Sequence, residues 1–147
     1  MAPHVGKVEI ARPPGEVYSY VTDPTHFPEW QDDVISVRME KGEPTEVGSE
    51  FVTVRRMGGV ERPITQQVTE VDRDRYWACR AVEGVIRPSA TISIEPLDNG
   101  ARTQVTFTLD FEGSTVGVPL VPAVRKMAAK AAPRSYGKLK ELLESQS

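Results

Sequence analysis

Apolar and polar residues alternate with a period of two along most of the chain between residues 34 and 111, a pattern typical of half-buried β-strands. The same alternation opens the chain, where Val8 and Ile10 alternate with Lys7 and Glu9. The pattern predicts seven strands, at residues 5–10, 34–39, 50–57, 64–71, 76–82, 89–94 and 104–111. Short connections between consecutive strands favour an antiparallel meander.

The breaks between the predicted strands carry residues that favour turns. Asn99-Gly100 is the strongest signal, because both residues tolerate a positive φ and suit a tight hairpin. The other breaks fall at Lys41-Gly42, Gly58-Gly59, Asp72-Arg73-Asp74 and Glu83-Gly84.

Two short helices are predicted between the first and second strands. Pro13 and Pro14 end the first strand, and Pro14 suits the first turn of a helix over residues 14–22, where Glu16 favours the helix dipole. Asp23-Pro24 then supplies an N-cap followed by proline, which predicts a second short helix towards Trp30.

The last part of the chain has the 3.6-residue period of one long amphipathic helix. The apolar stripe predicted to face the sheet comprises Leu120, Val124, Met127, Ala128, Ala131, Ser135, Leu139 and Leu142. The opposite side carries Arg125, Lys126, Arg134, Lys140 and Glu144. Pro133 removes a bond to Ala129 and is expected to bend this helix.

Composition favours one globular domain over residues 1–147. The chain is 39% hydrophobic and 27% charged, with a net charge of −3 that argues against nucleic-acid binding. No apolar run approaches the 18 or so residues of a membrane span, so stable membrane insertion is not expected. One cysteine and two histidines predict no internal disulfide and no zinc site. Because the start also lacks a signal-peptide core, we expect a cytoplasmic protein, either a monomer or a homodimer.

The order of strand, two short helices, six strands and a long helix resembles the polyketide cyclase/dehydrase branch of the START-like (Bet v 1-like, SRPBCC) superfamily. The resemblance extends from about Val5 to Leu143. The segments that carry it are Val8-Glu9-Ile10, Arg12-Pro13-Pro14-Gly15-Glu16-Val17-Tyr18, Val21-Thr22-Asp23, Phe27-Pro28-Glu29-Trp30, Glu46-Val47-Gly48-Ser49-Glu50-Phe51 and Asp98-Asn99-Gly100-Ala101-Arg102-Thr103-Gln104-Val105.

This resemblance implies an α+β helix-grip fold, in which a curved, seven-stranded antiparallel sheet wraps around the C-terminal helix and leaves a pocket for apolar or amphipathic small molecules. The sequence pattern supports the pocket independently. One face of each predicted strand is apolar, and one slim helix cannot fill the whole concave side of a seven-stranded sheet. The residues predicted to point inward are Phe51, Ile64, Val68, Trp77, Cys79, Ala90, Ile92, Ile94, Val105, Phe107 and Leu109.

From these positions we predict a set of ligand-binding residues. Trp30, Trp77 and Phe107 are expected to line one cavity, with Arg55 or Gln66 at its polar end. The whole set comprises Trp30, Phe51, Arg55, Gln66, Trp77, Cys79, Ile92, Phe107 and Leu109. The competing interpretation is that each of these residues is only part of the core, and that Arg55 lies in solvent.

The sequence assigns no catalytic residue, metal or cofactor. His26 stands four residues before Trp30, but no partner that would make it a general base is visible. The first hypothesis is therefore the binding or carriage of a hydrophobic small molecule. The alternative is a cyclase or dehydratase that acts by substrate positioning with acid–base assistance, and a third reading is a partner domain with a vestigial cavity. Whether the protein is an enzyme is left open.

Overall fold

Seven strands form one antiparallel sheet in the order β1-β7-β6-β5-β4-β3-β2. The computed structural model describes residues 3–57 and 59–145, so Gly58 of the predicted Gly58-Gly59 turn lies outside the described residues. The strands are β1 (His4–Ile10), β2 (Val34–Lys41), β3 (Glu50–Met57), β4 (Val60–Asp72), β5 (Tyr76–Ala81), β6 (Ile86–Leu97) and β7 (Arg102–Gly113).

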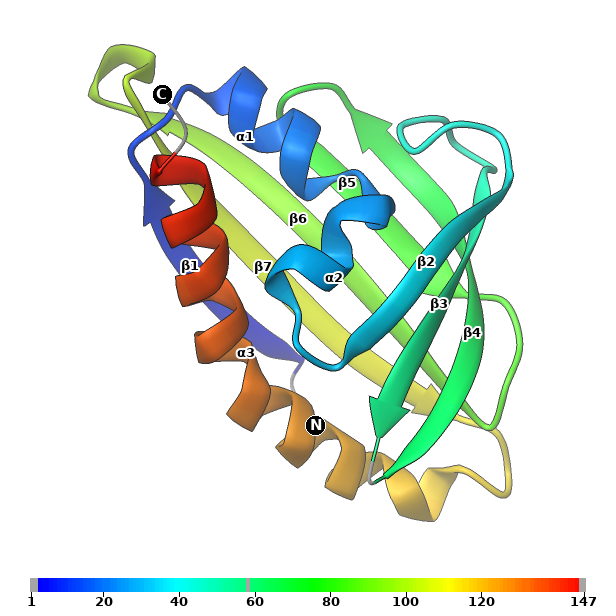
Figure 1. The fold of residues 1–147 in the computed structure, drawn as a ribbon. Coiled ribbons are helices and arrows are strands. Elements are labelled where there is room, and N and C mark those ends of the chain that lie inside the picture. Colours follow the sequence, from blue (N-terminus) through cyan, green and yellow to red (C-terminus); the bar gives the residue numbers. More distant parts are fainter. Residues whose placement is uncertain (1–2, 58, 146–147) are drawn as a thin grey trace.

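Strands β2 to β7 follow one another as a meander, and β1 closes the sheet beside β7. The sheet is strongly curved, and α3 lies along its concave side next to β1 and β7 (Figure 1). The short helices α1 and α2 cover the concave side towards the other strands (Figure 1). The predicted α+β helix-grip architecture is thus confirmed.

The helices begin where the sequence predicts. They are α1 (Pro14–Val21), a 3-10 turn (Pro24–His26), α2 (Phe27–Trp30), two further 3-10 turns (Asp98–Gly100 and Val118–Leu120) and α3 (Val121–Glu144). The Asp23 carboxylate caps the first 3-10 turn, because it accepts a 3.0 Å hydrogen bond from the Thr25 backbone N–H. None of these helices has the length and apolar character needed to cross a membrane.

Strand alternation places the large apolar side chains on the concave face. Trp77, Ile92 and Phe107 occupy one cross-strand row through β5, β6 and β7, and all three are buried. Most of the residues predicted to point inward are buried in the same way, whereas Ile64, Ala90 and Leu109 are half-buried.

Tyr136 determines how α3 sits on the sheet. Its ring stacks on Phe107 with ring centroids 4.4 Å apart and an interplanar angle of 7°. The same ring lies directly over Gly6, the cross-strand partner of Phe107, so closely that a Cβ atom at position 6 would collide with it. A glycine in the edge strand β1 therefore provides the space that the helix needs.

This position of α3 shows that part of the apolar stripe predicted to face the sheet is wrong. Leu120, Met127 and Ala131 are exposed, and the helix buries Ala132, Leu139 and Leu143 with Tyr136 half-buried beside them. Steps of three and four residues fit two adjacent faces of a helix equally well, and the large tyrosine ring decides between them. Pro133 lies within α3, which continues through it as one helix.

Replacing Gly6 by Ala should destabilise the protein, because the new methyl group must displace the stacked Tyr136 ring. We expect a loss of about 1–3 kcal/mol, the usual cost of overpacking, measured as the free energy of unfolding in urea. Gly15→Ala is the matched control, since nothing lies within 4 Å of its Cβ position and α1 should gain slightly.

Making the same substitution in a Tyr136→Ala background separates the collision with the ring from any general effect of an alanine in β1. In that background Gly6→Ala should cost almost nothing, because the obstructing ring is gone. If Gly6→Ala lowers the free energy of unfolding equally with and without the Tyr136 ring, the ring is not the reason that position 6 requires glycine.

Candidate functional site

Six aromatic rings form a continuous series across the concave interior. They come from α2, from β3, β5 and β7, and from α3, so that segments far apart in sequence meet there. The successive centroid distances are 6.2 Å for Trp77–Phe51, 6.2 Å for Phe51–Phe27, 5.7 Å for Phe27–Trp30, 5.6 Å for Trp30–Phe107 and 4.4 Å for Phe107–Tyr136. Trp77 and Trp30 thus belong to one aromatic interior, although they are linked through Phe51 and Phe27 rather than directly.

The two tryptophans differ in the hydrogen bonding of their indole N–H groups. Trp77 donates a 3.0 Å hydrogen bond to the Pro44 carbonyl oxygen, which ties the β2–β3 connection to the sheet. Trp30 is only 3% exposed, and its buried Nε1 has no hydrogen-bond partner among the described residues. A buried donor without an acceptor costs about 1–3 kcal/mol, so Trp30 carries unused hydrogen-bonding capacity inside the protein.

A short polar chain crosses the inner face of β3, β4 and β5. Thr53 Oγ1 donates to Gln66 Oε1 over 3.0 Å, and Gln66 Nε2 donates to Cys79 Sγ over 3.7 Å. All three side chains are buried. Burial raises the pKa of the Cys79 thiol to about 12, while the nearby Arg55 guanidinium acts in the opposite direction. The thiol is therefore neutral, and it packs and accepts a weak hydrogen bond rather than acting as a nucleophile.

Arg55 already has a counter-charge within the chain. Its Nη1 lies 3.0 Å from Asp33 Oδ2, and its side chain is 22% exposed. Asp33 precedes Val34, the cross-strand partner of Arg55, so the strand register brings the pair together. Arg55 is therefore largely covered rather than free in solvent, and the carboxylate that a covered arginine requires comes from the protein itself.

The first residue of β1 adds a group that sequence reasoning did not single out. His4 is the cross-strand partner of Leu109 and shares the face of Gly6 and Val8. Its side chain is half-buried, and its buried Nε2 has no partner in the part of the chain that the structure describes. An imidazole nitrogen in this position can accept a proton or a hydrogen bond.

The predicted ligand-binding set also did not include Phe27, Tyr136 and Asp33. Phe27 and Tyr136 enter the interior from helices, where alternation along a strand gives no information. Tyr136 did carry a signal, because its spacing of four from Ala132 and three from Leu139 places it on the face that α3 buries. Burial raises the pKa of the Tyr136 hydroxyl to about 12, which keeps it protonated as a donor.

His26 lies outside this interior. Its ring stacks on Tyr20 with centroids 4.5 Å apart, its Nδ1 lies 3.2 Å from the Tyr20 carbonyl oxygen, and its Nε2 lies 3.9 Å from Asp23. These partners hold it against the outside of α1, so it does not join the aromatic series.

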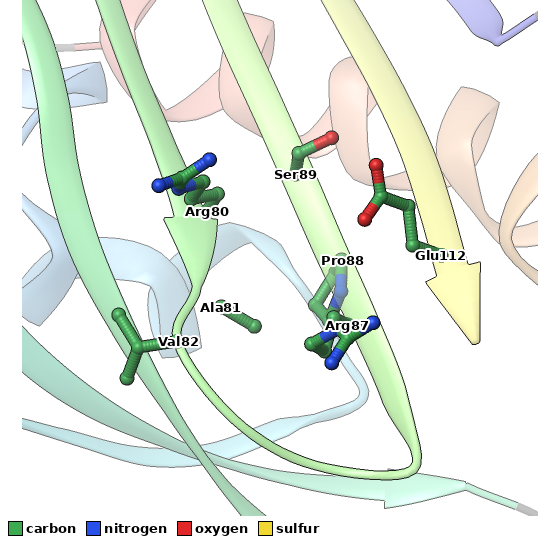
Figure 2. Close-up of a pocket in the computed structure, with 7 residues that line it drawn as sticks. All are labelled: Arg80, Ala81, Val82, Arg87, Pro88, Ser89 and Glu112. Atoms are coloured by element: carbon green, nitrogen blue, oxygen red, sulfur yellow. The ribbon is translucent and has the colours of Figure 1, made fainter. Parts of the chain in front are cut away.

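Two hollows of the structure lie elsewhere. One, of about 310 Å³, is lined by the seven residues of Figure 2, from the ends of β5, β6 and β7. Arg80 and Ser89 in it are cross-strand partners on the face opposite Cys79 and Ala90, so it opens on the outer side of the sheet. The other, of about 370 Å³, lies between Asp32 and the exposed side of α3 around Arg134 and Lys138. Neither corresponds to the pocket that the sequence predicts between sheet and helix.

No group of three or more His, Cys, Asp or Glu side chains within residues 3–57 and 59–145 is arranged to hold a metal ion. The interior offers instead a wide aromatic surface with a few N–H and O–H donors. Such a surface suits an apolar molecule that carries one or two hydrogen-bond acceptors.

Solved structures with the same fold come from several bacteria. The chain is similar to a START superfamily protein from Mycobacterium smegmatis, with a TM-score of 0.81, 18% identity and full coverage of both chains. It is also similar to the Zhui aromatase/cyclase from Streptomyces sp. R1128, with a TM-score of 0.81, 15% identity and coverage of 97% of this chain and 93% of that one. A protein from Thermus thermophilus gives a TM-score of 0.79 at 20% identity, with 99% of each chain covered.

No curated protein matches the sequence. Residues 3–144 do match the sequence profile of a family described as polyketide cyclase/dehydrase and lipid transport. That match covers nearly the whole chain and agrees with the helix-grip fold and with the residues of the resemblance. The protein therefore belongs to the polyketide cyclase/dehydrase and lipid-transport family.

Proposed function

We propose that the protein binds or carries a hydrophobic or amphipathic small molecule between the sheet and α3, in contact with the aromatic series. The observation that supports this most directly is the buried indole N–H of Trp30, which has no hydrogen-bond partner within the described part of the chain. A ligand oxygen that accepts from this donor would remove the cost of burying it. The family's description and the helix-grip fold support ligand binding in general terms.

The distribution of polar groups defines the ligand further. The Arg55 charge is balanced by Asp33, so this arginine is not free to neutralise a buried ligand carboxylate. Trp30, Gln66 and Tyr136 offer neutral donors instead. We therefore expect a ligand with a mainly apolar or aromatic body and carbonyl or hydroxyl groups, in preference to a long-chain anion whose headgroup is buried.

Access to this interior requires movement of the rings, because neighbouring rings of the series pack against one another. The half-buried positions Leu109, Ala90 and Ile64 lie at the end of the sheet away from α1. Entry at that end would bring a ligand past His4 and Leu109 before it reaches Phe107 and Trp30.

The alternative function is that of a cyclase or dehydratase, and one observation favours it. His4 combines a position on the inner face with an unpartnered ring nitrogen. A general base placed beside a positioned, reactive chain could assist proton transfers, and the Zhui aromatase/cyclase shares the fold.

Trp30→Phe should weaken ligand binding by roughly 2–10-fold, since it keeps an aromatic ring but removes the N–H and one hydrogen bond. Stability of the free protein should change little, because the variant also removes an unsatisfied donor. The measurement is displacement of the neutral apolar dye Nile red by a panel of polyphenols and long-chain ketones, together with the melting temperature.

Trp77→Phe is the matched variant. It leaves the Pro44 carbonyl without its donor, so it should lower the melting temperature by several degrees while leaving the ligand profile nearly intact. A ligand profile that changes with Trp77 and not with Trp30 would contradict the proposed place of the ligand. The absence of any displacement by the whole panel would contradict binding itself.

The cyclase alternative predicts a different outcome at His4. His4→Gln keeps a polar side chain of similar length but cannot act as a base near neutral pH, so turnover of a reactive polyketide mimic should fall by about 10²–10⁴-fold while its affinity is retained. His26→Gln, on the outside of α1, serves as the control. Equal product formation in buffer, in wild type and in both variants would rule out catalysis and leave binding as the function.

A further inference from the structure

The connection from β7 into α3 exposes apolar side chains that the fold does not use. Val116, Val118 and Leu120 are 76%, 57% and 52% exposed, and Met127, two turns further along the same helix face, is 47% exposed. Leu120 and Met127 are two of the residues that the sequence pattern assigns to the core and the structure leaves outside it. Several exposed apolar residues in one segment indicate an interaction site more strongly than scattered ones.

This segment is held in place by the neighbouring β5–β6 connection. The Ser114 backbone N–H donates a 3.0 Å hydrogen bond to the Val85 carbonyl oxygen. Gly117 packs against the same carbonyl so closely that a Cβ atom there would collide with it. Val85, itself 44% exposed, therefore adjoins Val116 and Val118, and the two connections end the molecule on the same side (Figure 1).

The charge of the chain is distributed very unevenly around this segment. Residues 113–140 contain six of the 18 basic residues and none of the 21 acidic residues. The segment therefore carries a formal charge of +6, and the rest of the chain carries −9. Such a separation within a protein of net charge −3 points to a partner of negative charge.

Internal ion pairs neutralise only part of this charge. Arg125 pairs with Asp110 at 2.6 Å, while Arg134 and Lys138 share the single carboxylate of Asp32 at 2.8 and 3.0 Å. Lys126 and Lys130 are exposed one turn apart, and no described residue forms an ion pair with them. They flank Met127, so cations and apolar groups occupy the same exposed side of α3.

We propose that this basic-apolar surface, formed by Val85, Val116, Val118, Leu120, Lys126, Met127 and Lys130, docks on the surface of an anionic lipid bilayer. Apolar side chains at the tip would enter the boundary between headgroups and acyl chains, and the lysines behind them would contact the anionic headgroups. A second copy of the chain fits less well, because a symmetric contact would bring two +6 segments together. Nucleic acid fits less well because the tip is apolar. The proposal concerns the outside of the molecule and does not depend on a ligand in the interior.

The test is sedimentation of the full-length protein with sucrose-loaded vesicles of phosphatidylcholine and phosphatidylglycerol in a 7:3 ratio. We expect partitioning onto these vesicles, little onto pure phosphatidylcholine, and release at high salt. The charge-reversed variant Lys126→Glu/Lys130→Glu should lower the partition coefficient at least tenfold. The matched control is Lys41→Glu/Arg73→Glu, which makes the same change in net charge at exposed positions outside this segment.

Insertion of the apolar tip gives a second readout. Val118→Cys, labelled with an environment-sensitive dye, should shift its emission to the blue on anionic vesicles, whereas Val47→Cys, equally apolar and 64% exposed in the β2–β3 connection, should not. The native Cys79 is buried and should not react. Equal losses for both charge-reversed variants, or no shift at position 118, would overturn the proposal. Concentration-dependent dimerisation that Val118→Ser abolishes would assign the surface to a second copy instead.

Discussion

The contact between the Tyr136 ring and the bare backbone at Gly6 is the constraint on which the interior depends. It fixes α3 against the edge strand β1 and its neighbour β7 and determines the rotation of the helix about its own axis. Because the helix is seated at one side of the sheet, the inner faces of β3 to β5 need another cover. Phe27 and Trp30 supply it from α2, and the continuous series of rings follows from that arrangement.

The same rotation explains both surfaces that we consider functional. Inside, it brings Tyr136 onto Phe107 and places the Trp30 indole in a fully apolar setting, where its N–H has no acceptor among the described residues. Outside, it turns Leu120 and Met127 away from the core and aligns them with Lys126 and Lys130. An interior with unused donors and an exterior that combines apolar and basic groups are consistent with a protein that takes up an amphipathic molecule near a lipid surface.

Much of the fold could be predicted because it is encoded locally. Alternation specifies the seven strands and most of the inner face, and Pro14 and Asp23-Pro24 specify the helix starts. The predictions that failed depend on contacts between distant segments, which the pattern of apolar and polar residues does not contain. The orientation of α3 depends on a close approach to Gly6, and the partner of Arg55 depends on the β2–β3 register, which brings in Asp33 from before the strand. The free Trp30 N–H could not be distinguished from the bonded Trp77 N–H, since both lie in similar aromatic surroundings.

The central claim is that the Trp30 indole N–H donates a hydrogen bond to the bound ligand. Two-dimensional ¹⁵N NMR tests it directly, because the protein has two tryptophans and hence two indole signals, which Trp30→Phe assigns. On titration with a ligand identified by displacement, the Trp30 indole signal should move downfield and exchange more slowly with solvent, while the Trp77 signal stays in place. A saturated complex in which the Trp30 signal is unchanged would contradict the account.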